Sequence, residues 1–450
     1  MQVTASIFKA YDIRGLVGSE LTPDFAFATG AAFARFIIQE REPGTIVVGE
    51  DMRDSSAPLA DAFSDGATSQ GMDVIRIGLA STDMLYFASG KLNLPGIMFT
   101  ASHNPAQYNG MKLCKSGAKP IGQESGLLTI KQLIQEGIAI SNRPVGSIRK
   151  MDLLDDYVTY LIDRFPKKTF KKRKLKVVID AGNGMAGFTA PSVMKKLNVE
   201  LIPMYFDLDG DFPNHEANPI EPKNLKDLQK RVKKEKADLG LAFDGDADRC
   251  FLVDENADLV NPSSLTALIA VRELKRNPGA SIIYNLISSK AVPEIILENG
   301  GKPVRSRVGH SYIKSLMAQT GAVFGGEHSG HFYFADFWRA DSGMLAALYA
   351  LAELMDSPKS LSEILESFDR YFSSGEINTQ VKDASKSIKL VRKKYENENE
   401  IDDLDGLTVS SQKWWFNLRP SNTEPLLRLN VEADSPKLMA EIRDTVLSLI

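Results

Sequence analysis

The sequence predicts a multidomain α/β protein that closes with a smaller α+β domain. Three observations lead to this prediction. Short apolar runs alternate with helical patterns over most of the 450 residues, which is typical of βαβ units and of parallel or mixed sheets. Similar units recur about every hundred residues. After about residue 368, a highly charged stretch gives way to aromatic and strand-like segments.

Each expected strand is a short apolar run followed by a polar segment. The first run is succeeded by a helical pattern over residues 58–71. Because open α/β sheets bind ligands at the carboxyl ends of their strands, functional side chains are expected directly after these runs. The runs cover residues 45–49, 96–100, 175–180, 238–243 and 281–286.

Composition narrows the class of protein. Apolar residues make up 43% of the chain, charged residues 25%, and the formal net charge is −4, so neither a nucleic-acid nor a membrane partner is expected. The most apolar stretch, residues 344–355, is shorter than the roughly 18 residues of a membrane span. Two distant cysteines and the lack of a secretory signal pattern predict a cytoplasmic protein.

Three aspartates follow the run at 238–243. Asp244, Asp246 and Asp248 alternate with small residues, so an extended or turning segment can bring the three carboxylates together. Such a cluster needs a cation, and hard oxygen ligands suit Mg²⁺. An EF-hand calcium loop would require glycine where Arg249 stands, and a solvated acidic turn is the structural alternative.

Ser102 follows the run at 96–100, in the segment Thr-Ala-Ser-His-Asn-Pro. A serine at the end of a strand can carry a phosphoryl group, especially beside a metal. Its neighbour His103 does not make a hydrolase dyad, because dyad partners meet in space and not in sequence. Lys112 can supply positive charge to a phosphoryl group in transfer. A purely structural turn is the alternative.

A glycine-rich segment covers residues 325–331. Its glycines allow close backbone approach, and Glu327 and Ser329 offer an acceptor and a hydroxyl suited to sugar hydroxyls. His328 and His331 invite a zinc interpretation, but no convincing third ligand is close to them in the sequence.

A proline-bounded loop near the C-terminus forms a plausible phosphate cradle. Arginine binds phosphate through two parallel hydrogen bonds, and the loop adds two hydroxyls and an amide. Its members are Arg419, Ser421, Asn422 and Thr423. A surface turn is the alternative.

Two further segments are weaker signals. Near the N-terminus, Tyr11 and Arg14 can contact phosphate or anchor the first strand. His310 can provide an imidazole that titrates near neutral pH, or be a simple loop histidine.

Together and in this order, these segments resemble the α-D-phosphohexomutase superfamily, and specifically its phosphomannomutase/phosphoglucomutase branch. The resemblance runs from residues 11–14 to the loop at 419–424 and so covers essentially the whole chain. The family's phosphoserine motif matches residues 100–105, its metal loop 244–249, and its G-E-x-S-G-H sugar loop 326–331.

The resemblance implies four domains around a central cleft. Three are related mixed-sheet α/β domains, and the fourth is a smaller α+β domain of the TATA-binding-protein type. The expected boundaries are 1–148, 149–256, 257–368 and 369–450.

The resemblance also implies a mechanism. Phosphorylated Ser102 gives its phosphoryl group to a hexose monophosphate, and the 1,6-bisphosphate turns over and returns its other phosphoryl group. Mg²⁺ is held by Ser102, Asp244, Asp246 and Asp248, and glucose or mannose 1,6-bisphosphate acts as activator. The remaining roles are catalysis for Lys112, Arg249 and His310, and substrate binding for Tyr11, Arg14, His103, Glu327, Ser329, His331, Arg419, Ser421, Asn422 and Thr423.

The predicted activity is that of a phosphomannomutase, with a phosphoglucomutase or dual-specificity mutase as the alternative. His328 stands where dual-specificity enzymes often carry methionine, and Lys290 is displaced from the position of a substrate-contacting lysine in some members. A non-catalytic sugar-phosphate-binding protein is the rival from another class. The oligomeric state and the pathway are not predicted.

Overall fold

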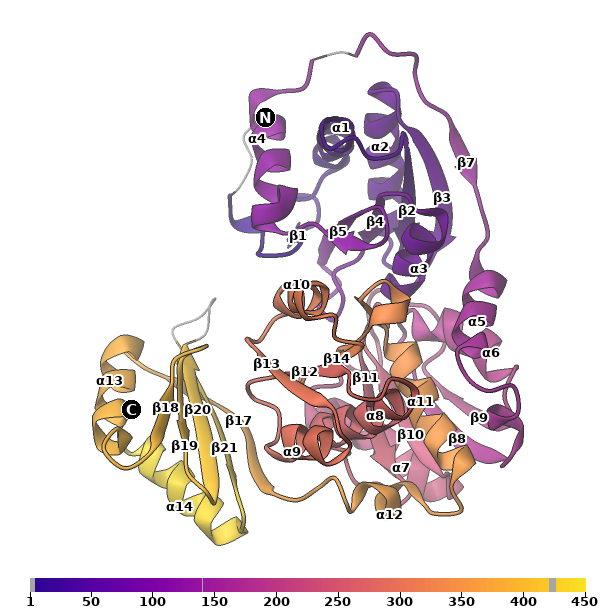
Figure 1. Ribbon diagram of the computed structural model, residues 1–450. Coiled ribbons are helices and arrows are strands. Elements are labelled where there is room, and N and C mark those ends of the chain that lie inside the picture. Colours follow the sequence, from indigo (N-terminus) through magenta and orange to yellow (C-terminus); the bar gives the residue numbers. More distant parts are fainter. Residues whose placement is uncertain (1–4, 140, 421–425) are drawn as a thin grey trace. The chain divides into compact units, whose positions relative to one another are not determined.

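The structure is a computed structural model that describes residues 5–139, 141–420 and 426–450 (Figure 1). The chain forms two compact units. Unit 1 comprises Met1–Val260 and Ser329–Ser362, and unit 2 comprises Asn261–His328 and Glu363–Ile450. Within the described ranges, none of the helices has the length and apolar character needed to span a bilayer.

The first sheet of unit 1 is mixed. Its central strands β4, β2 and β3 are parallel, and β7 extends the parallel part. At the other edge, β5 pairs antiparallel with β4, with β1 and with the short strand β6. The strands are β1 (Ile13–Leu16), β2 (Thr45–Glu50), β3 (Asp73–Leu79), β4 (Gly96–Phe99), β5 (Tyr108–Lys115), β6 (Lys119–Pro120) and β7 (Ile148–Lys150). The helices are α1 (Pro23–Gln39), α2 (Ser56–Ser69), α3 (Thr82–Leu92) and α4 (Leu128–Glu136).

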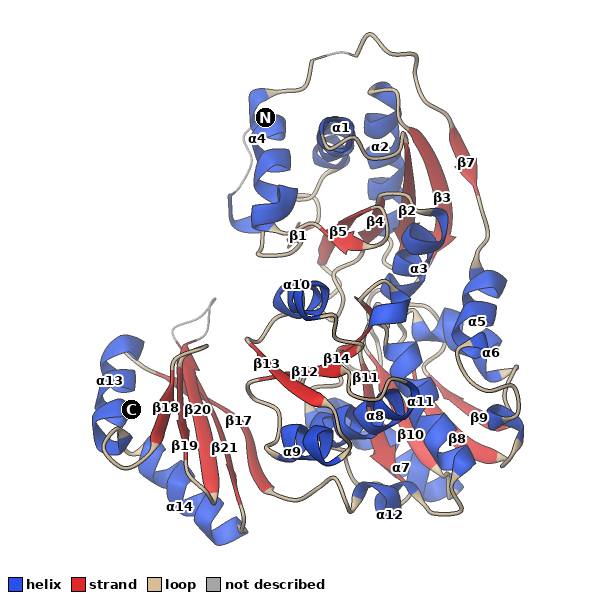
Figure 2. Cartoon of the chain, in the orientation of Figure 1, coloured by secondary structure: helices blue, strands red, loops and turns tan. Residues whose placement is uncertain are grey.

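Helices cover both faces of this sheet (Figure 2). The chain moves from β2 to β3 in one direction and returns past β2 to β4, so right-handed crossovers place α2 and α3 on opposite faces. Buried side chains of α1, α2 and α4 form one apolar core with the sheet. Inside it, the ring of Phe63 lies 6.0 Å from that of Phe33 and 5.7 Å from that of Phe99, centroid to centroid.

The second sheet of unit 1 has the strand order β11-β10-β8-β9, with β8, β9 and β10 parallel and β11 antiparallel. These strands are β8 (Leu175–Asp180), β9 (Val199–Met204), β10 (Leu239–Phe243) and β11 (Cys250–Asp254). The accompanying helices are α5 (Leu154–Asp163), α6 (Ala186–Met194) and α7 (Lys226–Glu235). Unit 1 also contains the antiparallel pair β15 (Phe332–Phe334) and β16 (Ala340–Asp341), which leads into the buried helix α11 (Gly343–Asp356).

Unit 2 begins with a parallel arrangement in which β12 pairs with both β13 and β14. The strands are β12 (Ser281–Asn285), β13 (Lys302–Ser306) and β14 (Phe324–Gly326). The helices are α8 (Pro262–Arg276), α9 (Ala291–Glu298) and α10 (His310–Thr320), and α12 (Leu361–Leu365) precedes the last sheet.

The last sheet is entirely antiparallel, in the order β17-β21-β20-β19-β18. Its elements are β17 (Phe372–Gln380), α13 (Ala384–Tyr395), β18 (Glu400–Asp402), β19 (Leu407–Ser410), β20 (Trp414–Pro420), β21 (Leu426–Ala433) and α14 (Pro436–Leu447). Both helices pack on one apolar core with the sheet, to which Val391, Phe416 and Val446 contribute. The predicted α/β class with a smaller C-terminal α+β domain is therefore confirmed.

Candidate active site

The site in unit 1 depends on a close approach of two loops. One loop follows β4 and carries Ser102, and the other follows β10 and carries the three aspartates. A side chain at Gly245 would place its Cβ only 2.4 Å from the carbonyl oxygen of Ser102, so glycine is required there. The loops that follow β4 and β10 therefore meet at these two residues.

Ser102 is 5% exposed and adopts a φ of 51°, a conformation that non-glycine residues seldom take. Its Oγ donates a 2.8 Å hydrogen bond to Asp244 Oδ2 and lies 3.2 Å from His103 Nδ1. Backbone strain of this kind persists where surrounding contacts enforce it, and it is common at functional sites. The Ser102 hydroxyl is therefore aimed at the acidic loop by the fold.

Asp244, Asp246 and Asp248 are buried, and each offers a carboxylate oxygen within 4.8 Å of the others. Asp246 Oδ1 and Asp248 Oδ1 are buried without a hydrogen-bond partner among the described residues. Buried carboxylate oxygens that lack donors are costly unless a cation compensates them. The donor set therefore fits a hard divalent cation such as Mg²⁺.

Lys112 lies on β5 and neutralises part of this charge. Its Nζ is 2.6 Å from Asp246 Oδ2 and 2.6 Å from Asp248 Oδ2. Burial by itself would lower the pKa of Lys112, but the two carboxylates hold that pKa well above its usual range. Burial and Asp248 would raise the pKa of Asp246, yet the Lys112 ammonium keeps it below its usual value. Lys112 is therefore charged in the site.

Arg249 connects Asp244 to His103. Its Nε donates to Asp244 Oδ2 over 2.8 Å, and its Nη2 lies 2.5 Å from His103 Nδ1. Burial nevertheless raises the pKa of Asp244 to about 7, because the guanidinium offsets the lost hydration only in part. Burial and the charge of Arg249 hold the pKa of His103 well below its usual range. A guanidinium can only donate, so His103 Nδ1 is an acceptor on a neutral ring.

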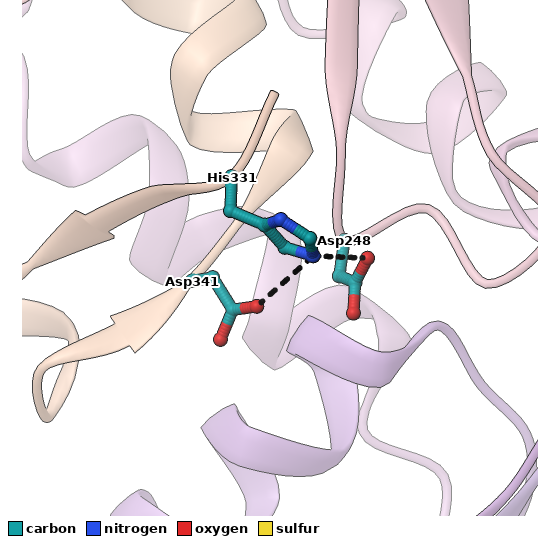
Figure 3. A group of neighbouring side chains, drawn as sticks. All are labelled: Asp248, His331 and Asp341. Carbon is teal, nitrogen blue, oxygen red and sulfur yellow. Dashed lines mark ion pairs between the residues drawn. The ribbon is translucent and has the colours of Figure 1, made fainter. Parts of the chain in front are cut away.

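His331 stands between two carboxylates from different segments (Figure 3). Its Nε2 is 3.6 Å from Asp248 Oδ1 and 4.0 Å from Asp341 Oδ2, while its Nδ1 is 2.9 Å from Ser329 Oγ. A backbone bridge between Arg249 and His331 brings this segment to the metal loop. His331 thus has one acidic partner on β16, ten positions further along the chain, and one in the metal loop, which is distant in sequence.

Arg14 lies on β1 and reaches the Ser102 loop. Its Nη1 donates to Asn104 Oδ1 over 2.5 Å, and its Nη2 to Asp12 Oδ2 over 2.6 Å. Tyr11 is half-buried just before β1. Arg14 is thus tied to the Ser102 loop by a hydrogen bond.

The other predicted residues belong to unit 2. Glu327 is buried, and its Oε1 accepts a 3.0 Å hydrogen bond from the backbone of Gly309, directly before α10. Arg419 lies on β20, where its Nη2 donates to Glu376 Oε2 over 2.8 Å. The side chain of His310 lies outside the described part, as do Ser421, Asn422 and Thr423.

Sequence reasoning missed two residues next to the site. Thr82 Oγ1 donates a 2.6 Å hydrogen bond to Asp246 Oδ2, and Arg53 contacts the Ser102 loop. Thr82 comes shortly after β3 and Arg53 shortly after β2. Arg53 follows the predicted run at 45–49, so the rule that selected the other segments, a polar group at the carboxyl end of a strand, could have pointed to it. Thr82 follows β3, which was not among the predicted runs.

Comparison with known proteins decides the family. Four models of the phosphoglucomutase/phosphomannomutase family match the chain in order, those of α/β/α domains I, II and III at residues 5–139, 155–257 and 261–371, and that of the C-terminal domain at 376–449. The chain belongs to the phosphoglucomutase/phosphomannomutase family.

Relatives of similar length support this family assignment. The chain is 40% identical to a phosphomannomutase of Escherichia coli over 98% of both chains, and 41% identical to one of Vibrio cholerae over 95% of this chain and 94% of the other. A crystal structure of a phosphoglucomutase/phosphomannomutase family protein from Burkholderia thailandensis matches with a TM-score of 0.90 and 33% identity, over 100% of this chain and 97% of the other. The chain is therefore a phosphohexomutase, an enzyme of the isomerase class, as the resemblance predicted.

Proposed function

We propose that this phosphohexomutase interconverts mannose 6-phosphate and mannose 1-phosphate through phosphorylated Ser102. The observation that supports this most is the 2.8 Å hydrogen bond from Ser102 Oγ to Asp244, within a buried set of carboxylates flanked by Lys112 and Arg249. The phosphomannomutase names of the E. coli and V. cholerae relatives support mannose as the sugar.

The proposed reaction has two transfers. In the first, the bond between phosphorus and Ser102 Oγ breaks, and a new bond forms to a free hydroxyl of the hexose monophosphate, whose proton leaves to a base. In the second, the other phosphoryl group of the 1,6-bisphosphate moves to Ser102 Oγ and its sugar oxygen regains a proton. Glucose or mannose 1,6-bisphosphate would charge Ser102 initially. Atoms and charges balance over the cycle.

The chain contributes charge and position to these transfers. Lys112 and Arg249 form ion pairs with the acidic loop, and they would stabilise negative charge on the phosphoryl oxygens. Asp244, Asp246 and Asp248, with an oxygen of phosphorylated Ser102, would hold Mg²⁺, which offsets phosphoryl charge when bound. Neutral His103 accepts from Arg249 and would keep that guanidinium directed at the site.

The remaining residues would recognise the sugar phosphate. We assign the sugar hydroxyls to Glu327 and Ser329, and proton transfer to His310. The residues assigned to substrate contacts, mainly with phosphate, are Tyr11, Arg14, His103, His331, Arg419, Ser421, Asn422 and Thr423. We place the domain boundaries at 1–148, 149–256, 257–368 and 369–450, and the enzyme in the cytoplasm, which suits its two buried free cysteines.

Phosphoglucomutase activity is the second candidate, because the description of the matching family covers both sugars. The 3- and 4-hydroxyls are alike in glucose and mannose, so glucose phosphates are expected as secondary substrates.

Mass spectrometry tests the phosphoserine. Purified protein incubated with glucose 1,6-bisphosphate should carry one phosphoryl group on the peptide that contains Ser102. Ser102→Ala should abolish both this mass shift and turnover. An unmodified Ser102 in wild-type protein after that incubation would instead favour a sugar-phosphate-binding protein without turnover.

A further inference from the structure

Arg53 is a buried arginine that the proposed mechanism does not use. It is 3% exposed and lies between β2 and α2, where sequence patterns did not single it out. We propose that Arg53 is a positioning residue that fixes the Ser102 loop in the conformation that phosphoryl transfer requires. This inference rests on the proposed function of Ser102.

The guanidinium of Arg53 gathers the carbonyl groups of the Ser102 loop. Nη2 donates to the carbonyl oxygens of Ser102 at 3.0 Å and Asn104 at 2.6 Å. Nη1 donates to those of Pro105 and Tyr108, both at 3.0 Å. One planar group thus binds four backbone carbonyls between residues 102 and 108. Only arginine among the side chains presents such a rigid fork of donors.

One of these carbonyls lies between Arg53 and the metal loop. The Ser102 oxygen that accepts from Nη2 is also the atom that a side chain at Gly245 would meet at 2.4 Å. The Ser102 loop and the metal loop therefore approach each other at the Ser102 carbonyl oxygen, the atom to which Arg53 donates. If this hydrogen bond were lost, the Ser102 backbone, with its unusual φ of 51°, could relax and carry the hydroxyl away from Asp244.

Arg53 is itself held from two sides. Its Nε lies 3.3 Å from Asp51 Oδ2, and Asp51 Oδ1 accepts from Ser56 Oγ at 2.5 Å and from the backbone of Arg53 at 3.0 Å. The ring of Phe212, from the segment between β9 and α7, lies under the guanidinium with its centroid 5.0 Å from Cζ. A preorganised arginine can impose its geometry on the loop instead of following it.

An alternative is that Arg53 only stabilises the core of its domain. Both interpretations predict a lower unfolding temperature when the side chain is removed. They differ in the kinetics expected of the folded variant. A positioning residue that never contacts the substrate should alter kcat and leave KM nearly unchanged, whereas a residue that only stabilises the core should leave both constants unchanged.

The test compares Arg53→Met and Arg53→Lys with Arg76→Met in the full-length enzyme. Arg76 is a suitable control because it forms ion pairs with Glu50 and Asp61 in the same domain, away from the Ser102 loop. We expect Arg53→Met to lower kcat by about tenfold or more with KM within about threefold, and Arg76→Met to keep the wild-type kcat. Added guanidinium at low concentration should restore part of the kcat of Arg53→Met and leave Arg76→Met unaffected.

Hydrogen exchange supplies a readout that does not depend on activity. Backbone amides of residues 101–109 should exchange faster in Arg53→Met than in either wild type or Arg76→Met. If Arg53→Met does not fold, Arg53→Lys provides the test. Lysine keeps the positive charge but cannot bind the four carbonyls at once, so this variant should show the same changes to a smaller degree.

Wild-type kcat and wild-type exchange in the folded Arg53 variant would overturn the proposal. A wild-type enzyme without mutase turnover would instead reject the proposed function. In that case the exchange data alone decide whether Arg53 holds the loop.

Discussion

The hydroxyl of Ser102 donates a 2.8 Å hydrogen bond to Asp244, which lies 142 positions further along the chain. The contact joins the loop after β4 to the loop after β10, and both of these residues are buried. Asp244 also accepts from Arg249, so the serine oxygen, a carboxylate and a guanidinium form one connected group. This group is the structural basis of the phosphoryl-transfer account, and its parts can be tested separately.

Asp246→Asn should lower kcat by about a hundredfold or more, because the charge offset supplied by a bound metal is worth several kcal/mol. Asp258→Asn is the matched control, since Asp258 is an exposed aspartate in the turn after β11. Steady-state kinetics on both variants measures the effect. Activity of Asp246→Asn within about threefold of wild type would remove Asp246 from the metal site.

Magnesium should stabilise the protein, as a ligand that binds only the folded state does. Raising free Mg²⁺ to about 100 times its dissociation constant adds about 2.7 kcal/mol to the free energy of unfolding. The thermal midpoint of wild-type protein should rise with Mg²⁺ and fall on chelation, whereas that of Asp246→Asn should respond much less. Equal shifts in both proteins would place magnesium binding elsewhere.

Arg419→Ala should chiefly raise KM, because the proposed partner of Arg419 is the phosphate group that does not react. Arg428 provides the control, since it lies on the neighbouring strand β21 and pairs with the same Glu376, 3.3 Å away. Arg428→Ala should leave KM near its wild-type value. An unchanged KM in Arg419→Ala, or equal increases in both variants, would contradict the assigned role.

Asp83 should make stability depend on pH. Its carboxylate is fully buried and accepts hydrogen bonds from Tyr157 at 2.7 Å, from Ser342 at 2.5 Å and from Ser81, and burial raises its pKa to about 6 from 3.8. The folded state thus binds the Asp83 proton more tightly than the unfolded state does. The stabilisation that this proton gives the folded state is full below pH 3.8 and is lost as the pH rises through about 6.

Replacing Asp83 by asparagine removes this titration. Relative to wild type, Asp83→Asn should gain about 1.4 kcal/mol of unfolding free energy between about pH 5 and 7.5. Asp73→Asn is the control, because hydrogen bonds from Ser147 lower the pKa of Asp73, and its effect should be constant over that range. Urea denaturation at several pH values measures both differences. If the difference in unfolding free energy between Asp83→Asn and wild type did not change with pH, the raised pKa of Asp83 would be contradicted.

Local patterns in the sequence predicted several of the strands well. The run at 175–180 is β8, the run at 45–49 is β2 with one residue added, and the helix expected at 58–71 is α2, two residues earlier at both ends. The two strands could be predicted because burial on both faces of a parallel strand leaves a continuous apolar run. The polar segments after them could be located by the same reasoning.

The contacts that organise the site could not be predicted in this way. Arg53 acts on backbone carbonyls some fifty positions away, and a carbonyl group has no signature in the sequence. Asp341 faces His331 only because β15 and β16 pair as a hairpin. Such partners follow from tertiary packing, so they appear only once the fold is known.

The most direct test of the central claim is the measurement of kcat/KM for mannose 1-phosphate and glucose 1-phosphate, with Mg²⁺ and a trace of glucose 1,6-bisphosphate. The account predicts turnover of both sugars, with a mannose-to-glucose ratio well above one. A ratio near or below one would make the enzyme a dual-specificity mutase or a phosphoglucomutase. The absence of turnover with either sugar would contradict the proposed function.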